Sequence, residues 1–305
     1  MRIGVFIGDT NGGRSTLDDI VASARHAEEL GFATAWLPQL PWSVDALVAL
    51  ACVGRATDRI ELGTAVMPTY PTHPMAMARA AATVDAAAPG RFVLGIGPSH
   101  PVVIEDMFGL AYDHPAAHTR EYVEVLRAAF AGGGHLEHDG EHFRVHAMFA
   151  APGSGTVPVL VAALAPLMLR LAGEVADGTI AYWADETAIA EHIVPRITAA
   201  AAAPPRIVAG VPCAVVDDAG TARRDARRLL DVYTAIPTYQ RILARGAAGH
   251  PVDVCAIGDE ATVAARVRSY QAAGATDFMA APLPIGDDPA RTWARTQALL
   301  AQLAS

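Results

Sequence analysis

Eight short apolar runs, each followed by a helical pattern, constrain the fold of this chain more than any other feature. They are apolar at successive positions, which is typical of parallel strands buried on both faces. The first helical pattern covers 15–31, with Ser15 or Thr16 as N-cap and Gly31 as C-cap. The runs span 3–8, 34–38, 60–68, 90–97, 157–164, 178–183, 206–216 and 276–282.

This repetition fits two architectures, a closed (β/α)8 barrel and an open, doubly wound sheet. Eight units in 305 residues favour the TIM barrel, whose usual size is about 250 residues plus insertions. No linker divides the chain, so we predict one domain over 1–305. Two departures stand out: an insertion after strand four at 98–156, with a helix at 116–131 and a hairpin turning at Asp139–Gly140, and extra helices near 218–247. Insertions that follow barrel strands lie at the C-terminal face, where active sites are found.

The composition argues against several classes of function. The formal charge is −9 and no basic tract exists, which disfavours nucleic acid as a partner. All 23 basic residues are Arg, and the absence of Lys excludes a Schiff-base lysine and a Walker lysine. An anionic ligand would therefore be held by Arg, by backbone N–H groups or by a helix N-terminus.

The cysteines and the apolar runs bear on where the protein works. Three widely spaced cysteines argue against a disulfide framework and a zinc ribbon. The first residues enter a strand pattern without a leader, and no uncharged apolar run reaches the roughly 20 residues of a membrane span. We expect a cytoplasmic protein with no membrane partner.

Several motifs allow both a functional and a structural interpretation. "GIGPSHP" at 95–101 has His100 where a dinucleotide fingerprint needs its third glycine, so we reject a Rossmann site and keep a tight turn as one option. The hairpin histidines match no zinc spacing, and we predict no metal. Pro166 begins a helix whose first N–H groups could meet an anion, with Arg170 one turn on. Trp42, Tyr182 and Trp183 at strand ends could line a pocket or cap the core.

Residues 63–80, "GTAVMPTYPTHPMAMARA", join a buried strand to a helix through Pro68, Pro71 and Pro74. The first two prolines stiffen the exit loop, and Pro74 suits the first position of the next helix. Tyr70 is placed to face a substrate, whereas His73 is expected to support the loop.

Three segments together resemble the luciferase-like superfamily, and most closely its branch of oxidoreductases that use the deazaflavin coenzyme F420. They are "ARHAEELGFATAWLPQ", "DALVALACVGRATDRIELGTAVMPTYPTHPMAMARAAATVDAAAPGRFVLGIGPSHP" and "VPVLVAALAPLMLRLAGEVADGTI". The resemblance implies a (β/α)8 barrel with a non-prolyl cis peptide at Ala65–Val66 behind the cofactor ring. It also implies a cofactor site made by Gln39, Ala65, Val66, Met67, Gly97, Ser99, Ala162, Ala163, Leu164, Ala165 and Pro166.

Two departures from that family bear on the reaction. Its sugar-phosphate dehydrogenases carry an acidic residue and a histidine where this chain has Gln39–Leu40, and a glutamate at the position of His100. Sugar-phosphate oxidation is therefore disfavoured. We expect hydride transfer between reduced F420 and a small organic molecule, most simply reduction of an activated C=C or C=N bond, with His100 as proton donor.

The pocket for this small-molecule substrate would be formed by Trp42, Tyr70, Tyr182 and Trp183. An FMN-dependent monooxygenase of the same superfamily is the main alternative. A cofactor-storage protein and a metal-dependent hydrolase using the hairpin histidines are the others. Dimers are common in families of this kind, so a homodimer is one option for the assembly.

Overall fold

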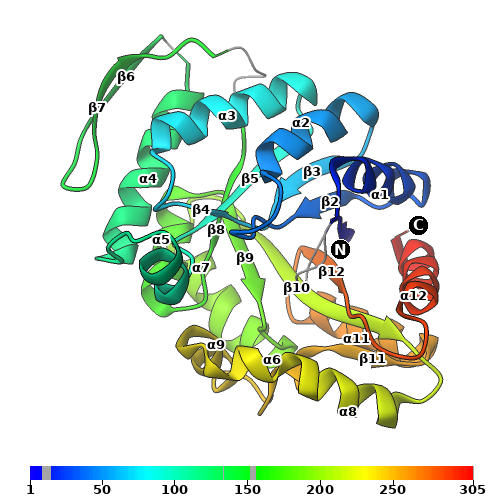
Figure 1. The fold of residues 1–305 in the computed structure, drawn as a ribbon. Helices are drawn as coiled ribbons and strands as arrows, with labels where there is room; N and C mark the ends of the chain where they lie inside the picture. The colour runs from blue at the N-terminus through cyan, green and yellow to red at the C-terminus, as the bar shows by residue number, and fades with distance from the viewer. Residues whose placement is uncertain (9–14, 133, 152–155, 305) are drawn as a thin grey trace.

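Parallel strands close into a barrel in the computed structural model, which describes residues 1–8, 15–132, 134–151 and 156–304 (Figure 1). Strands β9 and β10 pair with each other, and β12 pairs with both β10 and β1, so the ring has no free edge. The predicted (β/α)8 barrel is confirmed. In ring order the strands are β1 (Arg2–Phe6), β2 (Thr34–Leu37), β3 (Glu61–Thr64), β5 (Phe92–Gly97), β8 (Val159–Ala162), β9 (Gly178–Tyr182), β10 (Arg206–Val215) and β12 (Asp277–Pro282).

Helices surround the barrel on its outer side (Figure 1). The helices between successive barrel strands are α1 (Leu17–Glu29), α2 (Ala46–Ala56), α3 (Pro74–Ala87), α4 (Pro115–Phe130), α5 (Pro166–Val175), α7 (Val194–Ala200) and α11 (Glu260–Ala272), and α12 (Pro289–Ala304) follows the last strand. Shorter elements are the π-helix η1 (Val102–Met107), α6 (Glu186–Ala188), the π-helix η2 (Ile189–Ile193) and α10 (Pro251–Val254). The extra helices near 218–247 are α8 (Ala219–Leu230), the 3-10 helix η3 (Asp231–Ala235) and α9 (Pro237–Leu243). Among the described residues, no helix is long and apolar enough to cross a membrane.

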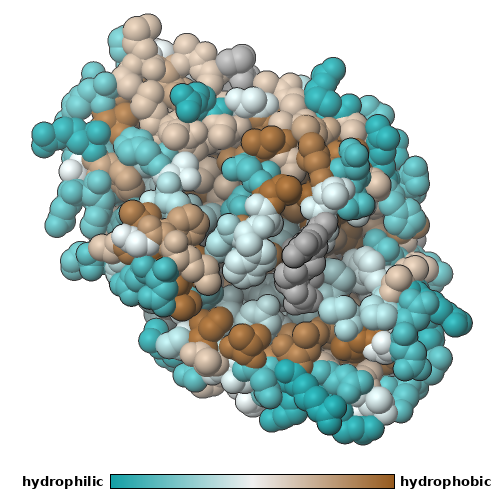
Figure 2. Space-filling model, viewed as in Figure 1, coloured by the Kyte–Doolittle hydropathy of each residue, from teal (hydrophilic) through white to brown (hydrophobic). Residues whose placement is uncertain are grey.

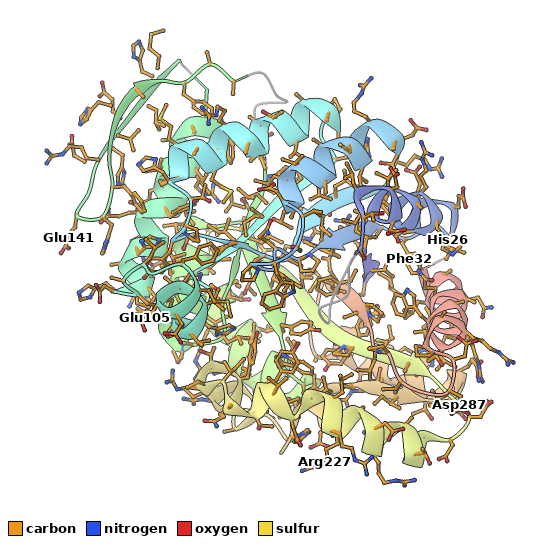
Figure 3. All side chains as sticks on the ribbon, viewed as in Figure 1. His26, Phe32, Glu105, Glu141, Arg227 and Asp287 are labelled. Atoms are coloured by element: carbon orange, nitrogen blue, oxygen red, sulfur yellow. The ribbon has the colours of Figure 1, made fainter. Side chains whose placement is uncertain are left out.

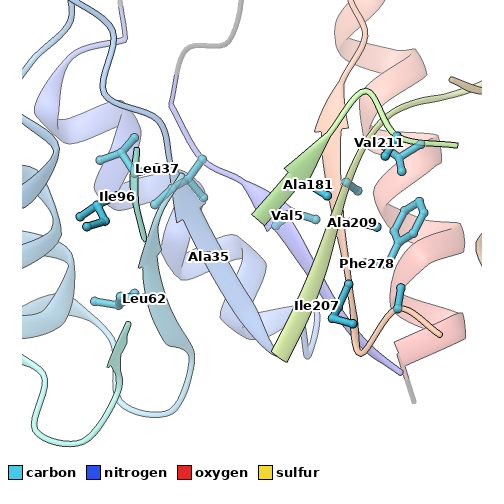
Figure 4. Packing of buried hydrophobic residues seen from close by; sticks show 14 of the residues in the cluster. Val5, Ala35, Leu37, Leu62, Ile96, Ala181, Ile207, Ala209, Val211 and Phe278 are labelled. Atoms are coloured by element: carbon cyan, nitrogen blue, oxygen red, sulfur yellow. The ribbon is translucent and has the colours of Figure 1, made fainter. Parts of the chain in front are cut away.

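Two separate cores explain why the strands are apolar at successive positions. Neighbouring residues alternate between them: Val5 and Ala181 belong to the outer core under the helices, whereas Phe6 and Ile180 belong to the barrel interior. Figure 4 shows part of the outer core, with Val5 and Phe278 on the adjacent strands β1 and β12, and Ala181 and Ala209 on the adjacent strands β9 and β10. The interior cluster consists of Phe6, Trp36, Val93, Leu160, Ile180, Val208, Met279 and Ala281.

Four details differ from the sequence prediction. The third strand is interrupted, with β3 ending at Thr64 and a short β4 (Met67–Pro68) pairing with β5. An extra strand, β11 (Ala256–Gly258), pairs with the far end of β10. The hairpin of β6 (His135–Asp139) and β7 (Arg144–Met148) is connected by the four residues 140–143, because Asp139 pairs with Arg144. Helix α1 has the predicted Thr16 as N-cap, but its C-cap is Leu30, and the predicted Gly31 follows it with a φ of 83°.

An ion-pair network occupies the end of the barrel where the strands begin. Arg206 on β10 donates to Asp277 on β12 at 2.5 Å and to Glu61 on β3 at 2.7 Å, and its guanidinium lies 5.4 Å from the centre of the Trp36 ring. Arg2 contacts the same two carboxylates from a more exposed position. The network therefore ties together three strands that are distant in sequence.

Glu121 of α4 fastens the β6–β7 hairpin to the body of the protein. Its carboxylate accepts the backbone N–H groups of Glu141, His142 and Phe143 at 2.8 to 3.0 Å. Burial raises the pKa of Glu121, but these three donors outweigh burial, so the net shift is downward. This contribution to stability is complete above the ordinary carboxylate pKa and is lost as pH falls through the lowered value.

We expect Glu121→Gln to free the hairpin connection, because a neutral amide accepts these three hydrogen bonds poorly. The amide hydrogens of residues 141–143 should exchange about tenfold faster or more. Hydrogen exchange read by mass spectrometry measures this. The matched control is Glu141→Gln, whose side chain points to solvent at the hairpin tip (Figure 3). Equal exchange in both variants would contradict the assignment.

Candidate active site

The floor of the candidate site is built from three of the predicted cofactor residues. The Ala65–Val66 peptide bond is cis, as the family resemblance implied. Gly97 ends β5 beside Val66 and Ala162: a Cβ added to Gly97 would lie 3.1 Å from Val66 Cγ2 and 3.0 Å from Ala162 Cβ. Ala65 and Val66 also pack on the interior cluster. Small side chains therefore pack closely together over the barrel core at the ends of these strands.

Thr64 locks the interrupted strand to its neighbour. Its hydroxyl donates to the Gly95 carbonyl at 2.8 Å and accepts the Gly95 N–H at 2.9 Å. A Cβ on Gly95 would lie 2.0 Å from the Thr64 carbonyl oxygen, so only glycine fits this approach. The next residues, Met67 and Pro68, then pair with Ile96 and Gly97. The chain is held on both sides of Ala65–Val66.

The loop after β5 carries Ser99 and His100. Ser99 has a φ of 64°, and its carbonyl accepts the Tyr112 hydroxyl at 3.2 Å. His100 is partly buried, and its Nε2 lies 3.2 Å from the Tyr239 hydroxyl. Burial lowers the pKa of His100 below its ordinary value. The His100 carbonyl accepts the N–H groups of Val103 and Ile104, which starts η1.

The loop after β8 leads into the first turn of α5. Pro166 is the first helical residue, as predicted, and the preceding Ala165 offers no side-chain cap to the helix N–H groups. These N–H groups lack intrahelical partners and carry the positive end of the helix dipole. His192 donates from Nε2 to the Leu164 carbonyl at 2.8 Å, so the loop is held in place from η2.

A groove of about 770 Å³ begins at Pro166 and runs between α5 and α7. It is lined by Pro166, Arg170, Glu174, Pro195, Arg196, Ala199 and Ala200. Arg170 pairs with Glu174 at 2.6 Å, and Arg196 donates to the His192 carbonyl at 3.0 Å. The Arg196 bond stays within its own helical segment, and the guanidinium groups of Arg170 and Arg196 border the groove.

The predicted pocket aromatics fall into separate groups. Tyr182 and Trp183 lie 4.9 Å apart and line a small cavity of about 10 Å³ together with Tyr233. Trp42 is 61% exposed. Tyr70 stacks on His118 at 4.0 Å and donates its hydroxyl to the Asp113 carbonyl at 2.6 Å, and among the described residues no ring contact joins it to Tyr182 or Trp183.

The Gln39 side chain is engaged by its own loop. Its Oε1 accepts the Ala46 N–H at 2.8 Å, and its Nε2 donates to the Leu40 carbonyl at 2.9 Å. His73 likewise caps α3, with Nδ1 accepting the Met75 N–H, which is the supporting role expected for it. Among the described residues, no group of three or more His, Cys, Asp or Glu could hold a metal ion.

Sequence reasoning missed Tyr233 and Tyr239. Both come from the extra helices, and they pack around Trp183 with ring centres 4.9 and 6.3 Å away. The extra helices were expected at the C-terminal face, so "YTAIPTY" at 233–239 was the available signal. The contact between Tyr239 and His100 could not be read from spacing, because 139 positions separate them.

The luciferase-like monooxygenase family model matches residues 1–277. This chain belongs to that family. The F420-dependent glucose-6-phosphate dehydrogenase of Nocardia farcinica is 38% identical over 141 residues, covering 44% of this chain and 41% of that protein. The chain spans less than half the length of the first curated relatives that it matches.

Solved structures of other proteins show the same fold over nearly the whole chain. The coenzyme F420-dependent tetrahydromethanopterin reductase of Methanopyrus kandleri superposes with a TM-score of 0.79 at 21% identity, covering 99% of this chain and 97% of that one. A type II Baeyer–Villiger monooxygenase from Pseudomonas putida, solved with FMN, gives 0.76 at 18% identity over 99% and 97%. Both F420 and FMN proteins therefore use this barrel.

Proposed function

We propose that this chain is an F420-dependent oxidoreductase that transfers a hydride between reduced F420 and an organic acceptor, reducing an activated C=C or C=N bond. One observation carries the proposal. The close-packed floor at Val66, Gly97 and Ala162 lies at the strand ends from which α5, a helix without a side-chain cap, begins. The floor suits a planar ring, and the helix start with its arginines suits an anionic chain. The Nocardia relative named for F420 supports the choice of cofactor.

The residues fit such a cofactor in two places. A side chain at Gly97 would crowd Val66 and Ala162, so the three residues form a close-packed base that would support the ring. The loop 162–166 would hold the anionic part through backbone N–H groups, with Arg170 and Arg196 along the groove. When bound, the cofactor supplies a two-electron hydride, and the protein orients the acceptor and provides a proton.

His100 is the side chain proposed to provide that proton. It lies on the loop that follows Gly97, and its imidazole is partly buried, which limits exchange with bulk water. An organic acceptor would meet a largely apolar entrance: Figure 2 shows hydrophobic side chains over α2, over η1 and beside α8. The exposed apolar residues on these elements include Val48, Val102, Met107 and Leu229. This environment favours an acceptor of mainly apolar character.

FMN-dependent monooxygenation is the second candidate, supported by the shared fold of the FMN-bound Pseudomonas protein. Purification from a host that makes no F420 separates the two. The proposal expects a colourless protein that quenches F420 fluorescence on titration and saturates at one equivalent per chain. A yellow protein with tightly held FMN and no F420 quenching would overturn it.

Arg196→Ala should weaken F420 binding by about tenfold, because one charged donor that borders the groove is lost. The fluorescence titration measures the effect, which should shrink at high salt. Arg227→Ala is the matched control, since Arg227 is an exposed arginine of α8, away from the groove (Figure 3). An unchanged F420 affinity in Arg196→Ala would show that the groove is not part of the cofactor site.

A further inference from the structure

His100 contacts α9, one of the extra helices that lie outside the eight β/α units of the barrel. Its Nε2 lies 3.2 Å from the Tyr239 hydroxyl, and the two rings meet edge to face with centres 5.1 Å apart. Tyr239 belongs to α9 and packs against Tyr233 and Trp183 at 6.0 and 6.3 Å. Trp183 is 1% exposed, so the aromatic cluster of Trp183, Tyr233 and Tyr239 is anchored in the core through this residue.

We propose that Tyr239 is a positioning residue for His100: its hydroxyl accepts the Nε2–H, so that Nδ1 is the nitrogen that exchanges a proton with the acceptor. This inference rests on the proposed role of His100 as proton donor. Tyr239 acts only through His100 and need not touch the acceptor.

The physical reason is the choice between two tautomers. A neutral imidazole carries its hydrogen on either nitrogen, and the hydrogen bond to one nitrogen decides which. Burial lowers the pKa of His100, so the neutral ring dominates at pH 7 and the choice matters. Among the described residues, the titratable neighbours are Tyr239 on α9 and, beside the adjacent Ser99 carbonyl, Tyr112. Neither is charged at neutral pH, because burial raises the pKa of both phenols.

The proton passes from Nδ1 of His100 to the acceptor. The protonated ring holds hydrogens on both nitrogens, with Nε2–H bound to Tyr239. The Nδ1–H bond breaks as a new bond to hydrogen forms on one atom of the acceptor double bond, while the hydride reaches the other atom. The electron pair of the broken bond stays on Nδ1, which leaves the neutral tautomer that Tyr239 favours. Solvent then returns a proton to Nδ1.

Nitrogen-15 NMR of histidine-labelled protein tests this without cofactor, since protonated and bare ring nitrogens have well-separated shifts. The His100 signals are identified by their loss in His100→Ala. We expect hydrogen on Nε2 in the wild type and in Tyr233→Phe, a matched control from the same ring cluster. Tyr239→Phe should show a mixture of tautomers. The same His100 tautomer in all three proteins would overturn the inference.

Single-turnover kinetics with reduced F420 gives the second readout. Tyr239→Phe should be about tenfold slower than Tyr233→Phe at equal F420 affinity. The loss of rate with rising pH should also begin at a lower pH in Tyr239→Phe, because the lost acceptor stabilised the protonated ring. Equal rates and equal pH profiles in the two variants would contradict the inference. Failure of the proposed function is distinct, because the wild type itself would then not oxidise reduced F420 with any acceptor.

Discussion

His100→Ala should slow the single-turnover oxidation of reduced F420 by an acceptor by about 100-fold or more, which is the usual contribution of a general acid. The F420 dissociation constant should change little, because the floor at Val66, Gly97 and Ala162 and the α5 loop are untouched. Stopped-flow absorbance of reduced F420 measures the rate, and fluorescence titration measures the affinity.

His26→Ala is the control for His100→Ala, since His26 is an exposed histidine of α1, away from the site (Figure 3). It should react like the wild type. An unchanged rate in His100→Ala would mean that another group supplies the proton, and a loss confined to F420 affinity would make His100 a cofactor contact.

The single-turnover rate of the wild type should also depend on pH in the way expected if His100 is the acid. Burial lowers the pKa of His100 below the ordinary 6.5. The protonated ring is therefore depleted as pH rises through that lowered value, and the single-turnover rate should fall in the same range. A rate that is flat below pH 6.5 and falls only in the alkaline range would point to a different acid.

Arg206→Met should have the largest effect on stability, about 3 kcal/mol, because it strands a buried carboxylate. The Asp277 side chain is 4% exposed and receives a 2.5 Å bond from Arg206, which also holds Glu61. Methionine matches the aliphatic stem but cannot neutralise either carboxylate. The melting temperature should fall by several degrees, as read by circular dichroism.

Arg2→Met is the matched control for this network. The Arg2 side chain is 43% exposed and lies 3.1 Å from Glu61 and 3.8 Å from Asp277, so its loss should cost about 1 kcal/mol or less. Equal melting points in Arg2→Met and Arg206→Met would show that the buried contact adds nothing beyond a surface pair.

The sequence predicted the structure correctly where a local physical rule decides which residue can occupy a position. Successive apolar positions required strands covered on both faces, and Phe6 and Val5 indeed belong to the two different cores. Pro74 and Pro166 start helices because a missing N–H does no harm there. The cis bond at Ala65–Val66 was placed by family resemblance.

Contacts between distant segments could not be predicted in this way. Tyr70 was expected to face a substrate, but its ring stacks on His118 and its hydroxyl is taken by the Asp113 carbonyl, both in the insertion after β5. The contact of Glu121 with the hairpin and the contact of Tyr239 with His100 likewise depend on how the insertions pack against the rest of the protein. No local pattern encodes such a contact, because both partners are ordinary surface-compatible residues.

The most direct test of the proposed function is the fate of the transferred hydrogen. Reduced F420 carrying deuterium at its hydride position is mixed with a panel of compounds with activated C=C and C=N bonds, without oxygen. The proposal predicts anaerobic turnover, with one deuterium in the reduced product at the atom that receives the hydride. Turnover that requires oxygen and bound FMN, with no deuterium transferred, would contradict it.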